Sequence, residues 1–216
     1  GGTTTVFDFA LQKKGNGLIQ TAKERDELCA PAACVDYAFH LVVSDLRPEI
    51  LEELKICVDY GIPSFKVFMV YKKEGLMADD GVLCQVLEKS KEIGAIIAVH
   101  AENPDLIDIK TEQFLNERKT SPWYHYLSRP EFVEAEADKR AIHWAKALNA
   151  PLYIVHLANK EGMEEVKRAR DEGYEIYAET CPQYLYFTNQ VYKREDGRNF
   201  VCSPPIKGKE SQDALW

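Results

Sequence analysis

Several features that would place this 216-residue chain in a common class are missing. No apolar run approaches the length of a membrane span, and residues 1–5 lack the basic and apolar regions of a signal peptide. There is no glycine-rich phosphate loop and no low-complexity segment. Basic residues are fewer than acidic ones: the formal net charge is -8, which argues against nucleic acid or an anionic membrane as a partner. The 45% of hydrophobic residues is typical of a soluble globular domain with one core.

The cysteines give no sign of a disulfide framework or a metal cluster. Six of them are scattered along the chain, and no two form a CxxC pair. Cys29 and Cys34 lie close together in sequence, but by themselves they would supply only half of a zinc site. Reduced thiols of this kind are typical of a cytoplasmic protein. We therefore expect free cysteines and a cytoplasmic location.

Strand-like and helix-like stretches alternate along the whole chain. Most expected strands start about thirty residues apart, which is the size of a βαβ unit. Repeated units of this kind predict a parallel sheet with helices outside, in either a doubly wound sheet or a barrel. The expected strands are residues 3–9, 36–43, 64–70, 95–100, 151–156 and 174–178, with residues 200–202 as a candidate seventh. The expected helices are residues 17–28, 48–60, 80–93, 106–118, 131–148, 161–172 and 210–216, with a loop through residues 121–123.

One lysine stands inside an apolar, aromatic-rich strand. Of residues 64–71, all except Lys66 are apolar, aromatic or a small hydroxyl residue. A buried ammonium is costly, and a lysine relieves that cost by losing its proton. The neutral amine can add carbon dioxide and become a carbamate, whose two oxygens can bridge two metal ions. The alternative is a lysine at a strand end that reaches water or pairs with an acid.

Two later strands end in histidine. Five apolar residues precede His100, and four apolar or aromatic residues precede His156. In a βα-barrel, reactive residues stand at the carboxyl ends of different strands, and neutral imidazole is a common zinc ligand. A structural histidine is the alternative at each position, and we interpret His40 as structural. Glu102 follows His100 and is a candidate group that orients the imidazole, or part of a helix-capping loop. Glu179 follows the sixth expected strand and is either functional or part of a turn before Pro182.

Six short motifs occur in one order along nearly the whole chain. They are residues 65–71 (FKVFMVY), 99–103 (VHAEN), 129–136 (RPEFVEAE), 154–157 (IVHL), 179–183 (ETCPQ) and 202–205 (CSPP). As a set they resemble the dihydropyrimidinase and hydantoinase family, which are cyclic amidases of the amidohydrolase superfamily. The resemblance implies a (β/α)₈ TIM-type barrel, an α/β fold, with two zinc ions bridged by a carboxylated lysine. It also implies a homo-oligomer, a tetramer.

The resemblance assigns roles to individual residues. Lys66 matches the carboxylated bridging lysine, which is both a metal ligand and part of the catalytic centre. His100 and His156 match the two histidines that bind the second metal. Tyr71 matches the tyrosine whose phenol stabilises the oxyanion, and Ser203 matches the serine near the amide of the substrate ring.

The implied reaction is metal-dependent hydrolysis of a small cyclic amide, such as a hydantoin or a 5,6-dihydropyrimidine, by a bridging hydroxide. Phe68 and Tyr71 would line the substrate pocket. Two alternatives stay open: an allantoinase- or dihydroorotase-like amidase, and a catalytically inactive dihydropyrimidinase-related assembly protein. The inactive relatives lack the lysine and some of the histidines, whereas Lys66, His100 and His156 are all present here.

Part of the family pattern does not occur in the chain. The HxH pair of the first strand is absent, as are the aspartate of the eighth strand and the small β domain. A complete barrel also needs about 250 residues. We therefore expect residues 1–216 to be a partial catalytic barrel domain that holds about strands 2 to 7 and is inactive alone.

Overall fold

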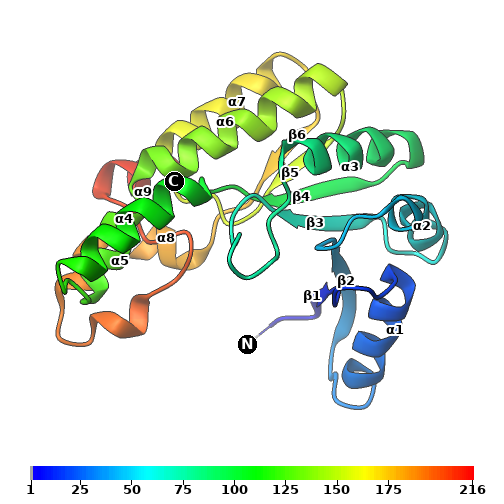
Figure 1. Cartoon of the computed structure of the whole chain (residues 1–216), viewed down its shortest axis with the longest axis horizontal. Helices are drawn as coiled ribbons and strands as arrows, with labels where there is room; N and C mark the ends of the chain where they lie inside the picture. Colours follow the sequence, from blue (N-terminus) through cyan, green and yellow to red (C-terminus); the bar gives the residue numbers. More distant parts are fainter. Residues whose placement is uncertain (1) are drawn as a thin grey trace.

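A computed structural model describes residues 2–216, and its strands form one parallel six-stranded sheet. The strands lie side by side in chain order (Figure 1), so each β-strand pairs with the next one in the sequence. This order confirms the predicted alternation of strands and helices. The strands are β1 (Thr5–Leu11), β2 (Asp36–Val42), β3 (Ser64–Phe68), β4 (Ile96–His100), β5 (Leu152–Ile154) and β6 (Ile176–Ala178).

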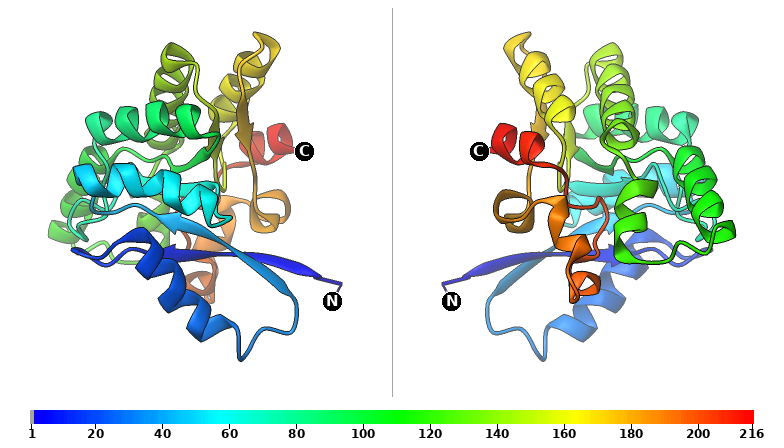
Figure 2. Two further views of the ribbon diagram at one scale, coloured as in Figure 1. Left: turned by 90° about the vertical axis from the view of Figure 1, so that its right-hand side faces the viewer. Right: turned by 90° about the vertical axis from the view of Figure 1, so that its left-hand side faces the viewer.

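The connecting helices form a layer outside the sheet. Successive helices α1, α2, α3, α6 and α7 contact one another in turn, and Figure 2 shows α1 and α7 at opposite ends of this layer. A doubly wound sheet would instead reverse its strand order and carry helices on both faces. The sheet is therefore a section of a TIM-type barrel. The helices are α1 (Leu18–Cys29), α2 (Pro48–Asp59), α3 (Asp80–Ile93), α4 (Pro104–Asn116), α5 (Pro122–Ser128), α6 (Glu131–Leu148), α7 (Lys160–Asp171), α8 (Pro182–Tyr186) and α9 (Lys209–Leu215), with 3₁₀ turns η1 (Asn189–Lys193) and η2 (Gly197–Phe200).

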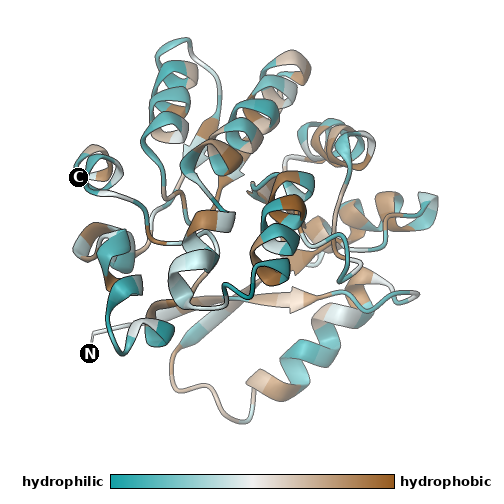
Figure 3. Ribbon diagram, turned by 60° about the vertical axis from the view of Figure 1, so that its left-hand side comes forward, coloured by the Kyte–Doolittle hydropathy of each residue, from teal (hydrophilic) through white to brown (hydrophobic). Residues whose placement is uncertain are grey.

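Local sequence signals explain where the helices begin and end. The Asp79 side chain accepts a hydrogen bond from the Val82 amide at 2.9 Å and so caps α3. Gly94 ends the same helix in a left-handed conformation, φ 70°, that glycine adopts without strain. Pro48 stands in the first turn of α2, where its missing N–H is not needed. Figure 3 shows both hydrophobic and hydrophilic residues on the helices, as expected for helices with one apolar side and one side in water.

The two faces of the sheet differ in character. Paired residues of parallel neighbours point to the same face. Phe65 and Val67 point under the helices together with their partners on β4, and all four are fully buried. Lys66 points to the opposite, inner face, where its neighbour is Ala98. The small alanine leaves room for the lysine side chain.

Two local predictions are wrong. The expected loop at residues 121–123 begins a helix, α5, because Pro122 occupies its first turn rather than interrupting a chain. The candidate strand at residues 200–202 is the end of η2 followed by chain outside the sheet. Pro204 and Pro205 follow it directly, and proline cannot donate to a strand ladder. Within residues 2–216, no helix combines the length and apolar character needed to cross a membrane.

Candidate functional site

The three predicted metal-binding residues meet at the carboxyl ends of the strands. His100 is the last residue of β4 and pairs in register with Phe68, the last residue of β3. Lys66 lies two residues earlier on the same face of β3, with Nζ 4.5 Å from the centroid of the Phe68 ring. His156 follows β5 by two residues, and its ring centroid is 4.5 Å from that of His100. The structure therefore brings Lys66, His100 and His156 together although they come from three different βα units.

The Lys66 amine is buried without a compensating charge. The residue is 2% exposed, and within residues 2–216 its Nζ makes no ion pair or hydrogen bond. Burial lowers the pKa of Lys66 to about 7, and the more distant Glu179 only partly opposes this. Among residues 2–216 this lysine has no acidic partner within ion-pair distance, and its low exposure keeps it from water, so the structure does not support the alternative of a strand-end lysine. In a large fraction of the molecules, the Lys66 amine is therefore uncharged at neutral pH.

His100 is held by a buried carboxylate. Its Nε2 lies 2.7 Å from Oε2 of Glu102, which is completely buried and also accepts a hydrogen bond from Arg129 at 2.9 Å. Burial would raise the pKa of Glu102, but the hydrogen bond from His100 and the charge of Arg129 bring it down to about 2. An ionised carboxylate only accepts, so Nε2 carries the proton and Nδ1 offers a lone pair. Burial lowers the pKa of His100, which keeps the imidazole neutral.

His156 is strained and incompletely hydrogen-bonded. Its backbone φ is 43°, in the left-handed region that costs a non-glycine residue about 1–2 kcal/mol. Its Nδ1 is buried and has no hydrogen-bond partner among residues 2–216. Burial lowers the pKa of His156 far below its usual value, and the nearby His100 and Lys66 lower it further. Two neutral imidazoles beside a neutral amine are nitrogen donors of a kind that binds a metal ion.

The histidines alone are an incomplete set of ligands. Across the described residues, no three His, Cys, Asp or Glu side chains form a group that could hold a metal ion. Lys66 is not of these four types, so its amine would be a further donor beside the two histidines.

Tyr71 and Ser203 lie at the same rim. The Tyr71 ring centroid is 5.2 Å from that of His100 and 5.6 Å from that of Phe68, and its backbone φ is 67°. Burial raises the pKa of Tyr71, and the neighbouring Ser203 hydroxyl only partly opposes the rise. The phenol therefore keeps its proton at neutral pH and can donate a hydrogen bond. The structure brings together all the predicted catalytic, substrate-binding and metal-binding residues.

Other predicted candidates have more local roles. His40 is half-buried, and its Nδ1 lies 2.6 Å from the Ser64 hydroxyl on the neighbouring strand. Glu179 is exposed and accepts a hydrogen bond from the Tyr153 hydroxyl at 2.9 Å. The interpretation of His40 as structural agrees with this contact.

Three buried or partly buried charged residues near the site have no role predicted from the sequence: Arg129, Glu134 and Lys207. The ammonium of Lys207 is 3.2 Å from Oε2 of Glu134, and both side chains are almost fully buried. A signal was available on α6, where Glu134 and Asp138 continue the buried stripe of small residues at helical spacing. Acids in an apolar stripe are unusual and indicate a buried partner.

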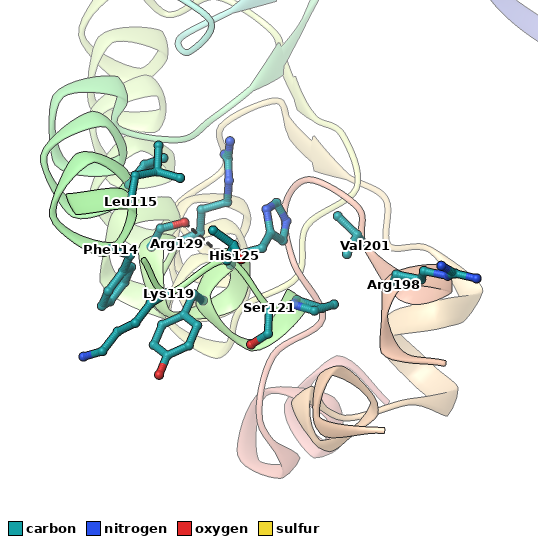
Figure 4. A pocket seen from close by; sticks show the side chains of 13 residues that line it. Phe114, Leu115, Lys119, Ser121, His125, Arg129, Arg198 and Val201 are labelled. Carbon is teal, nitrogen blue, oxygen red and sulfur yellow. Dashed lines mark hydrogen bonds between the residues drawn. The ribbon is translucent and has the colours of Figure 1, made fainter. Parts of the chain in front are cut away.

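A cavity of about 480 Å³ lies behind this site. Helices α4 and α5 and residues 198–201 line it, and Figure 4 shows His125 and Arg129 on its wall. His125 donates from Nε2 to the Cys202 carbonyl at 2.8 Å. Lys66, His100 and His156 do not line this cavity. The chemistry-bearing side chains gather at the strand ends instead.

Strand order, one-sided helices and the position of these side chains define the class: a section of an amidohydrolase-type (β/α)₈ barrel. No family model matches the chain. It is, however, 43% identical over 218 aligned residues to a D-hydantoinase from Ralstonia pickettii, covering all of this chain and 48% of that protein. The resemblance found in the sequence is thus confirmed along the whole of this chain.

Comparison with solved structures shows the same similarity. A dihydropyrimidinase from Brevibacillus agri superposes with a TM-score of 0.96 at 43% identity, covering 100% of this chain and 47% of the other. A dihydroorotase from Campylobacter jejuni matches with a TM-score of 0.65 at 15% identity over 97% of this chain and 63% of that one, which shows a common fold only. The chain spans about half the length of the curated relatives it matches.

Proposed function

We propose that the complete protein is a hydrolase that opens a small cyclic amide ring, a hydantoin or a 5,6-dihydropyrimidine. One observation supports this most strongly. The neutral amine of Lys66, the facing imidazoles of His100 and His156 and the phenol of Tyr71 lie on one rim of a barrel section. The relatives' names, D-hydantoinase and dihydropyrimidinase, point to the same ring chemistry.

We propose that two zinc ions bind here, bridged by carboxylated Lys66, with His100 and His156 on one of them. His100 would bind through Nδ1, because its Nε2–H is held by Glu102. When bound, the zinc ions supply hydroxide near neutral pH and polarise the substrate carbonyl. An HxH pair, an aspartate and a small β domain would lie in the rest of the protein, so residues 1–216 would be inactive alone.

The residues of this chain bind and orient the substrate. Tyr71 donates its phenolic proton in a hydrogen bond to the carbonyl oxygen, which becomes negative as the ring is attacked. Ser203, beside that phenol, hydrogen-bonds to the ring amide. Phe68 forms an apolar wall that contacts the ring and excludes water. Arg129 and Glu102 keep His100 in one tautomer throughout.

The alternatives differ in what they predict. An allantoinase- or dihydroorotase-like enzyme would use the same metal-binding residues on another ring, but the similarity to dihydroorotase extends only to the fold. A non-catalytic assembly protein would not need the buried amine of Lys66 beside two imidazoles. We further propose a cytoplasmic homotetramer that acts on a small cyclic ureide or imide.

A substrate panel tests the proposal. The complete protein, loaded with zinc, is assayed on hydantoin, 5,6-dihydrouracil, allantoin and dihydroorotate, with Lys66→Ala as the matched control. We expect turnover of hydantoin or dihydrouracil and none by Lys66→Ala. Turnover of only allantoin or dihydroorotate would support the alternative enzymes, and turnover of no cyclic amide would overturn the proposal.

A further inference from the structure

A chain of buried contacts begins at His100 and leads away from the rim. Glu102 binds His100 Nε2 at 2.7 Å, and Nη1 of Arg129 donates to the same carboxylate oxygen at 2.9 Å. The backbone carbonyl of Arg129 in turn accepts a hydrogen bond from Lys207 Nζ at 3.1 Å. Lys207 is therefore linked to Glu102 through Arg129, and to His100 through Arg129 and Glu102.

The chain continues to the loop that carries His156. Lys207 Nζ lies 3.2 Å from Oε2 of Glu134, and Oε1 of the same carboxylate accepts from the Ala158 backbone N–H at 2.7 Å. Ala158 is only two residues after His156 and is fully buried. One carboxylate thus holds both the ammonium of Lys207 and the backbone that follows His156.

That backbone needs holding because His156 is in the left-handed region, φ 43°. Such a conformation persists only where the surroundings fix the neighbouring chain. The next residue, Leu157, is fixed at its N–H by the Glu179 carbonyl at 2.7 Å and at its own carbonyl by Thr180 at 2.8 Å. Glu134 supplies the next attachment, at Ala158.

We propose that the buried pair Glu134–Lys207 positions the two imidazoles: it ties the loop after His156 to the loop after His100. The pair does not touch the reacting groups, so both are positioning residues. Lys207 also lies four residues after Ser203, so the pair anchors a third segment of the rim. The inference rests on the proposed function, because its consequence is a metal affinity.

The rival interpretation is a buried ion pair that serves folding alone. Replacing such a pair with apolar residues of similar size is often harmless to stability, whereas removing one partner leaves a buried charge. Double variants therefore separate positioning from folding. Glu134→Gln/Lys207→Met keeps an acceptor for the Ala158 N–H, whereas Glu134→Leu/Lys207→Met keeps none, and neither contains an unpaired buried charge.

The experiment measures cobalt affinity from visible absorption in the complete protein, together with the urea midpoint of each variant. Loss of groups that orient metal ligands weakens metal binding about 10- to 100-fold. We expect Glu134→Leu/Lys207→Met at the upper end of this range and Glu134→Gln/Lys207→Met at about tenfold. The control is Lys139→Met/Glu161→Gln, which removes an exposed ion pair between α6, the helix that carries Glu134, and α7, and should bind like the wild type.

The outcomes are distinct. Wild-type affinity in both buried-pair variants would overturn the inference while leaving the proposed function intact. A wild-type protein that binds no metal would overturn the proposed function itself. If Glu134→Leu/Lys207→Met does not fold, Glu134→Gln/Lys207→Met is the test, because it lacks the hydrogen bond from residue 207 to the Arg129 carbonyl. A cobalt affinity of that variant equal to the wild type's would again refute the positioning role.

Discussion

Replacement of Lys66 gives the most detailed prediction. With a pKa of about 7, roughly three quarters of the Lys66 side chains are neutral at pH 7.5. An ordinary lysine with a pKa of 10.5 would be neutral in only about one molecule in a thousand. Burial therefore raises the fraction of neutral amine several hundredfold, and the proposed carboxylation at neutral pH depends on this neutral form. Lys66→Ala and Lys66→Arg should both abolish binuclear metal binding, because arginine cannot form the carbamate.

The assay is carbon-13 NMR after incubation of the complete, metal-loaded protein with labelled bicarbonate. We expect one carbamate signal in the wild type and none in Lys66→Arg. A wild-type protein that is active, holds two zinc ions and still shows a bare ammonium on Lys66 would refute the reasoning.

The same burial predicts a pH dependence for the metal-free protein. Because the pKa of Lys66 falls from 10.5 to about 7 on folding, the unfolded state binds more protons between these values. Stability should therefore rise with pH across that window, by about 5 kcal/mol in total. Lys66→Met keeps the length of the side chain without its amine and should remove the rise, as measured by urea unfolding at pH 6.5 and 9. An equal rise in Lys66→Met would contradict this explanation.

Three further predictions concern neighbouring residues. Tyr71→Phe should lower kcat by about 10²–10³ with little change in KM, and a raised KM with unchanged kcat would contradict an oxyanion role. Gly162→Ala should destabilise by about 1–3 kcal/mol in urea unfolding, because its Cβ would collide with the Asp138 carboxylate; unchanged stability would refute the clash. Burial, reinforced by Glu134, raises the pKa of Asp138 well above 3.8. The contribution of Asp138 to wild-type stability should therefore fall as the pH rises from 3.8 to the pKa of this group in the folded protein. Asp138→Asn should flatten this fall, and a pH dependence of stability unchanged from the wild type would contradict it.

The sequence predicts the helices, the strands and those candidate site residues that stand in or at the end of an apolar strand. Lys66, His100 and His156 were found because each interrupts or ends an apolar strand, and parallel strands bring their carboxyl ends together. The long helix at residues 131–148 was predicted with its observed bounds, since its apolar spacing is regular. The helix α5 was missed because Pro122 is equally compatible with a loop and with the first turn of a helix.

Contacts between residues far apart in the chain, and the strained backbone at the rim, could not be predicted from the sequence. Arg129 contacts Glu102 from 27 residues away, and Lys207 contacts Glu134 from farther still, so no local spacing indicates either pair. Positive φ is uncommon for residues other than glycine, so the sequence does not fix it at Tyr71 or His156. These features arise only when the rim loops pack against one another.

The central claim is that this rim is part of a metal-dependent cyclic amidase. The most direct measurement combines the metal content of the complete protein with its rate of hydantoin and dihydrouracil hydrolysis, before chelation, after it and after zinc is restored. The account predicts two zinc ions per chain and an activity that is lost with them and returns with them. Ring opening at an unchanged rate in the metal-free protein, or none in the zinc-loaded protein, would contradict it.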